Sequence, residues 1–70
     1  MIKTKDLSEV AATGELLTVT STYYSHIAQI TGRVNLATVV DWTFIGVTEA
    51  HFNDKATLAM SELHEYLRNR

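Results

Sequence analysis

The most apolar run of the chain is LATVVDWTFIGV, residues 36–47, which contains the only tryptophan. Read with the two-residue period of a β-strand, this run has mainly apolar side chains on both sides. A strand with one solvated face alternates between apolar and polar residues, so we expect both faces of this strand to be covered. One side carries Val39, Ile45 and Val47, and what covers that side is the main question that the sequence raises.

The length and composition describe a small folded domain over residues 1–70. A chain of 70 residues lies near the size at which apolar burial only just offsets the loss of chain entropy. Its content of 46% hydrophobic and 20% charged residues predicts a folded chain. The absence of cysteine removes disulfides and thiolate zinc sites, so self-association is the expected way to bury more surface.

Two further strands are expected before the apolar run. Residues 16–24 and 27–31 are rich in β-branched and aromatic side chains, which favour a pleated surface. The threonines at 18, 20 and 22 form a hydroxyl row, typical of a solvated strand face. Gly32 and Asn35 are the strong turn formers nearby, and they place the second hairpin there.

A short helix is predicted at the N-terminal end. The segment Asp6-Leu7-Ser8-Glu9 has the spacing of a helix capping box. Gly14 stands where a left-handed C-terminal cap is expected. The pattern predicts a helix from about Leu7 to Thr13 that docks on the sheet, because two turns do not persist alone in water.

The C-terminal end predicts a longer amphipathic helix over residues 52–67. Its apolar side chains recur at helical spacing. They are Phe52, Ala56, Ala59, Leu63, Tyr66 and Leu67. Thr48 and Asn53 are both N-cap candidates, so the start stays open. The expected fold is α+β: a short N-terminal helix, a three-stranded antiparallel meander and a C-terminal helix packed on one face.

A partner interface is expected on the strands. Between Glu15 and Asp41 the one charged side chain is Arg33, whereas sheet edges are normally protected by charge. Asp41 either pairs with Arg33 across the hairpin or contacts a partner. The candidate interface residues are Val39, Asp41, Ile45, Val47, Tyr23 and Tyr24. We expect a homodimer in which either the face carrying Val39, Ile45 and Val47 or the threonine-rich edge meets its copy.

The titratable residues show no catalytic or metal-binding pattern. His26, His51 and His64 are far apart in sequence, and none belongs to a zinc-binding motif. No serine lies in a G-x-S-x-G turn. The carboxylates are scattered, with capping or surface roles expected for all but Asp41. We therefore expect no enzyme activity, no metal and no cofactor.

These features favour a non-catalytic protein-interaction module, a small inhibitor or adaptor that occupies the surface of a partner protein. Small inhibitors encoded by phages and mobile elements are the analogy, based on size. The chain shows no secretory leader and no apolar run long enough to span a membrane, so a cytoplasmic location without membrane contact is expected.

The alternative is a nucleic-acid-binding module. The expected order of helix, three strands and helix is similar to that of a double-stranded-RNA-binding domain. That family has a lysine cluster at the start of its second helix, where this chain has Lys55 beside Asp54. The net charge of −2 also disfavours phosphate binding.

Overall fold

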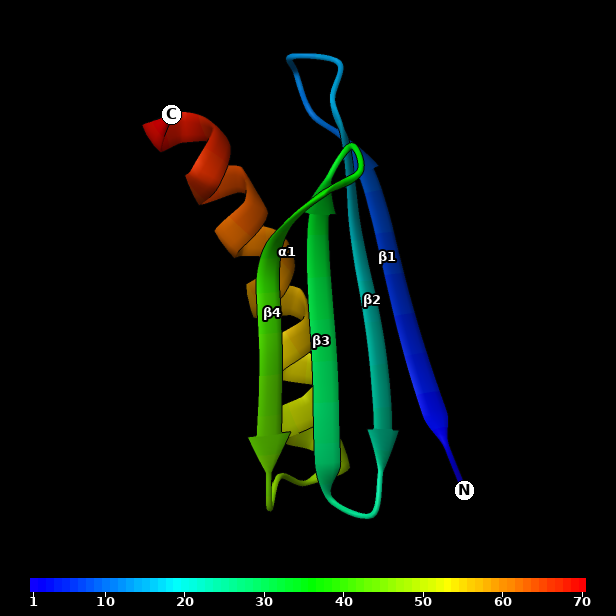
Figure 1. The fold of residues 1–70 in the computed structure, drawn as a ribbon. Helices are drawn as coiled ribbons and strands as arrows, with labels where there is room; N and C mark the ends of the chain where they lie inside the picture. The colour runs from blue at the N-terminus through cyan, green and yellow to red at the C-terminus, as the bar shows by residue number, and fades with distance from the viewer.

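The computed structural model describes residues 1–70 as a four-stranded sheet with one helix behind it (Figure 1). The strands are β1 (Lys3–Val10), β2 (Leu16–Tyr24), β3 (Ile27–Val34) and β4 (Ala37–Ile45), and the helix is α1 (Glu49–Asn69). Each strand pairs antiparallel with the next, in the order β1-β2-β3-β4. The α+β class is confirmed, with four strands instead of three and without an N-terminal helix.

The helix predicted from Leu7 to Thr13 is wrong. Residues 3–10 form β1 and pair with β2 along its whole length, from Lys3 opposite Tyr23 to Val10 opposite Leu16. The capping-box spacing coincides here with strand alternation, and pairing with β2 supplies hydrogen bonds that two isolated helical turns cannot sustain. Gly14 does adopt a left-handed φ of 89°, but it serves the turn between β1 and β2.

Helix α1 begins at the earlier of the two expected positions. Thr48 is the N-cap, and its side chain accepts a hydrogen bond from the backbone N–H of His51 at 3.3 Å. Although α1 is long, it is not apolar enough to span a membrane. It packs its apolar stripe on the sheet. The main core consists of Leu17, Val19, Ile30, Val34, Val40, Ala59, Met60 and Leu63, and a smaller cluster consists of Tyr23, Ala28 and Phe52.

Small residues let α1 lie close to the middle strands. Ala56 and Ala59 are fully buried on the helix, and Ser21 is buried beneath it. A Cβ added at Gly32 would lie 3.1 Å from the Leu63 Cδ2 atom and 3.2 Å from the Val40 Cβ atom. Larger side chains at these positions would push the two layers apart.

Val39 and Val47 lie on the other side of the sheet from Ile45, because of a β-bulge at Val39 and a turn at Gly46. Gly32 pairs with Val40 but Arg33 pairs with Thr38, so Val39 has no opposite residue. Val39 is partly buried against the main core. After β4, Gly46 has a φ of 79° and turns the chain, so that Val47 packs on the smaller cluster. The three residues therefore do not share one face.

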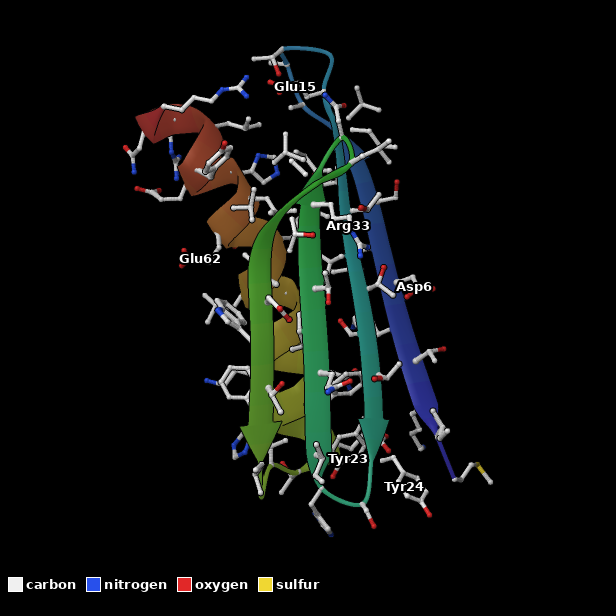
Figure 2. All side chains as sticks on the ribbon, viewed as in Figure 1. Asp6, Glu15, Tyr23, Tyr24, Arg33 and Glu62 are labelled. Carbon is white, nitrogen blue, oxygen red and sulfur yellow. The ribbon has the colours of Figure 1, made fainter.

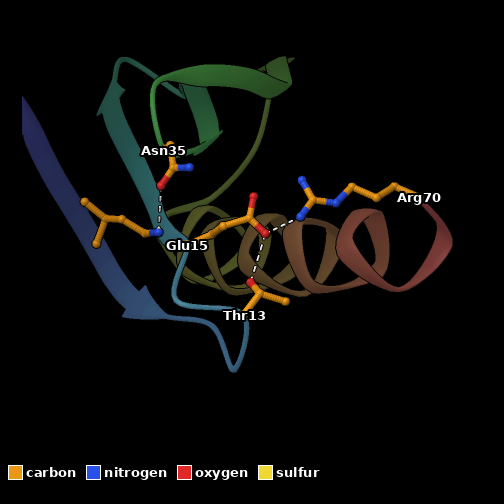
Figure 3. A network of polar contacts seen from close by, with 5 residues as sticks. Thr13, Glu15, Asn35 and Arg70 are labelled. Carbon is orange, nitrogen blue, oxygen red and sulfur yellow. Dashed lines mark hydrogen bonds and ion pairs between the residues drawn. The ribbon is translucent and has the colours of Figure 1, made fainter.

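A polar network lies where the β1–β2 turn, the β3–β4 turn and the C-terminal end of α1 meet (Figure 3). The Asn35 Oδ1 atom accepts a hydrogen bond from the backbone N–H of Leu16 at 3.0 Å. Thr13 Oγ1 donates to Glu15 Oε1 at 2.8 Å, and Arg70 forms an ion pair with the same carboxylate. These contacts join residues that are distant in sequence.

We expect this network to show in the titration of Glu15. Hydrogen bonds from Arg70 and then Thr13 hold the pKa of Glu15 below its ordinary value. A lowered folded-state pKa contributes stability above the unfolded pKa, and that contribution is lost as the pH falls through the folded pKa. Arg70→Ala should therefore raise the Glu15 pKa, and the difference in melting temperature from wild type should shrink in acid.

Carboxyl NMR shifts followed against pH measure this effect. Arg68→Ala is the matched control, because Arg68 pairs with Glu65 instead. A Glu15 pKa that is the same in Arg70→Ala and wild type would contradict the network.

Candidate functional site

The face of the sheet opposite α1 is covered by no other part of the chain (Figure 1). Leu17, Val19, Ser21 and Tyr23 of β2 are buried, so the alternate residues of that strand point away from the helix. We call the surface made by these outward residues of all four strands the open face. This uncovered sheet face is the candidate site.

Hydroxyl and amide side chains fill the middle of the open face in cross-strand rows. The first row consists of Thr4, Thr22, Gln29 and Thr43. The second consists of Asp6, Thr20, Thr31 and Asp41. The third consists of Ser8, Thr18, Arg33 and Thr38. Most of these groups both donate and accept hydrogen bonds.

Three charged side chains lie in these rows, and none belongs to an ion pair. They are Asp6, Arg33 and Asp41, of which Asp6 and Arg33 are labelled in Figure 2. The expected pairing of Asp41 with Arg33 is absent, because Asp41 lies opposite Thr31 and Arg33 lies opposite Thr38. Both remain free to contact a partner.

An apolar row closes the open face at the end of β2. Tyr24 lies opposite Ile27, which lies opposite Ile45. Tyr24 is 55% exposed and Ile45 is 81% exposed. Ile2, immediately before β1, is exposed as well. We call Tyr24, Ile27 and Ile45 the apolar row. Another molecule that covered this row would remove its apolar surface from water, which is energetically favourable.

The structure divides the six sequence-predicted interface residues equally. Tyr24, Asp41 and Ile45 lie together on the open face, whereas Tyr23, Val39 and Val47 lie on the helix side. Tyr23 stacks on Phe52 with ring centroids 5.2 Å apart, and its hydroxyl donates to the Val47 carbonyl oxygen at 2.8 Å. Tyr23 therefore holds the end of β2 against α1 and against the segment that follows β4.

Sequence reasoning missed the contribution of β1 to the open face. The capping-box pattern places Thr4, Asp6 and Ser8 in an N-terminal helix or just before it, although their alternation with Lys5 and Leu7 fits a strand. Ile27 is not among the sequence-predicted interface residues either. Its place at a strand start, opposite Tyr24 across a two-residue turn, was the available signal.

The histidines lie in three separate places. His26 Nδ1 lies 3.3 Å from both the Tyr23 hydroxyl and the Val47 carbonyl oxygen. His51 is in the first turn of α1, and His64 Nε2 lies 3.4 Å from Glu9 Oε2. No group of three or more histidine, aspartate and glutamate side chains is placed to hold a metal ion.

Comparisons with known proteins give no match to a family model, to a curated protein or to a solved structure.

Proposed function

We propose that the protein is a non-catalytic interaction module that self-associates through its open face. As a small inhibitor or adaptor, it would then present its remaining surface to a partner protein. The observation that carries the proposal is the uncovered open face, which ends in the exposed apolar row.

The chemistry of the open face is complementary to itself. A threonine or serine hydroxyl both donates and accepts, so hydroxyl rows on two copies can hydrogen-bond to one another. Arg33 lies on the strand next to Asp41, one row away. In a two-fold dimer of open faces, Arg33 of one copy can therefore pair with an aspartate of the other. The expected occupant of the open face is therefore a second copy of this chain.

Binding of nucleic acid is less well supported. Arg33 is the one basic side chain on the open face, and the neighbouring row holds two carboxylates, Asp6 and Asp41. A titration of fluorescently labelled duplex RNA and DNA with the protein, at low and high salt, tests this alternative. Phosphate binding must weaken steeply as salt rises, and such binding would favour the nucleic-acid alternative.

Site-specific cross-linking tests the proposal. The chain has no cysteine, so Thr20→Cys places a single thiol near the centre of the open face. Packed sheets lie about 10 Å apart, within the reach of a short bis-maleimide. We expect cross-linked dimer to be the main product at micromolar concentration. Asn53→Cys, on the exposed side of α1, is the matched control and should give little dimer.

Equal cross-linking of the two cysteine variants, or none of either, would contradict self-association through the open face. Thermal melts of both variants establish that each is folded before the products are compared.

A further inference from the structure

The two edge strands of the sheet, β1 and β4, differ in the number of charged side chains that protect them against the addition of another strand. β1 carries four charged residues along its length, Lys3, Lys5, Asp6 and Glu9, whereas β4 carries only Asp41. The outward backbone N–H and C=O groups of β4 face no further strand. Charged side chains are a common way to prevent the addition of another strand at an edge, so β4 is the edge open to strand addition.

A groove of about 430 Å³ runs beside β4 on the helix side. The C-terminal half of α1 reaches past β4 (Figure 1), so the groove has one wall on the strand and one on the helix. Val39 and Trp42 line the strand wall, and Glu62 and Tyr66 line the helix wall. The Trp42 ring is held edge-on to Phe44 with centroids 5.7 Å apart. A strand added to β4 would direct alternate side chains into this groove.

The charges around the groove favour a basic side chain. Arg70 is paired with Glu15, and Glu65 is paired with Arg68. Glu62 (labelled in Figure 2) forms no ion pair, so one carboxylate is left uncompensated beside two aromatic rings. A carboxylate and aromatic faces together attract an ammonium or guanidinium group.

We infer that β4 and this groove bind an extended segment of a partner protein that carries a lysine or arginine. The segment adds a fifth strand along residues 40–45, beyond the bulge at Val39, and its basic side chain enters the groove between Trp42 and Glu62. This site is separate from the open face, so its test and the test of self-association succeed or fail independently.

A defined peptide tests the inference. The probe is the capped heptapeptide Thr-Val-Thr-Lys-Thr-Val-Thr, in which valine and lysine share one face of a strand. Trp42 is the only tryptophan and lines the groove, so its fluorescence reports occupancy. We expect saturable binding, weakened about threefold to tenfold when norleucine replaces the lysine.

Variants of the protein test the preference for a basic side chain, and variants of the peptide test the addition of a strand to β4. Glu62→Gln should abolish the preference for lysine over norleucine, whereas Asp54→Asn, which removes a carboxylate elsewhere on α1, should keep it. N-methylation of one alternating set of peptide amides should prevent binding, because only one edge of an added strand pairs with β4.

Three results would overturn the inference: no saturable change in Trp42 fluorescence, equal binding of the lysine and norleucine peptides to wild type, or equal effects of N-methylation on the two sets of amides. Amide NMR shifts that move on β1 and not on β4 would also overturn it.

Discussion

Replacing Leu63 with alanine is expected to lower the free energy of unfolding by about 2–5 kcal/mol. Leu63 is fully buried at the centre of the main core, where its side chain packs against the sheet over Gly32. The truncation loses apolar burial and leaves a cavity that the close helix–sheet contact cannot easily fill. A 70-residue domain has a total stability of roughly 4–10 kcal/mol, so this loss is a large part of it.

Thermal or urea unfolding measures the change. Leu58→Ala is the matched control, because Leu58 lies on the same helix but is 44% exposed. Its unfolding free energy should change by about 0.5 kcal/mol or less. If Leu63→Ala melted at the same temperature as Leu58→Ala, the packing of α1 on the sheet would not be a main source of the stability of the fold.

The second large effect is expected from Ile45→Lys. Ile45 is 81% exposed at the end of β4, so a lysine there should leave the fold intact. In a dimer that buries the apolar row, the same lysine would place an unpaired ammonium group in the interface, at a cost of several kcal/mol. We therefore expect a folded monomer.

Leu58→Lys is the control for this substitution, because it adds the same charge at a partly exposed leucine on the opposite side of the molecule. It should keep the mass of the wild type, and circular dichroism should show both variants folded. A dimer that persists in Ile45→Lys would exclude the apolar row from the interface.

Much of the fold could be predicted from the sequence because most of its signals are local. The apolar stripe of α1 has a single period, and the expected strand at residues 16–24 is β2 with the same bounds. The N-terminal segment could not be assigned in this way. Asp6, Leu7 and Glu9 satisfy both a capping box and a strand alternation, and only pairing with the distant β2 decides between them.

The candidate site was predictable as far as strand alternation holds. Alternation from Asp41 to Ile45 gives the correct face for both residues. It fails for Val39 because a bulge inserts one residue, and no residue in 38–40 signals it. It fails for Val47 because the positive φ of Gly46 turns the chain toward the helix side.

The mass of the wild-type protein in solution tests the central claim, self-association, most directly. Light scattering behind a sizing column, over a hundredfold range of concentration, should give about twice the 7.8 kDa chain mass, falling toward one chain at the highest dilution. A mass of one chain at every concentration would contradict self-association through the open face.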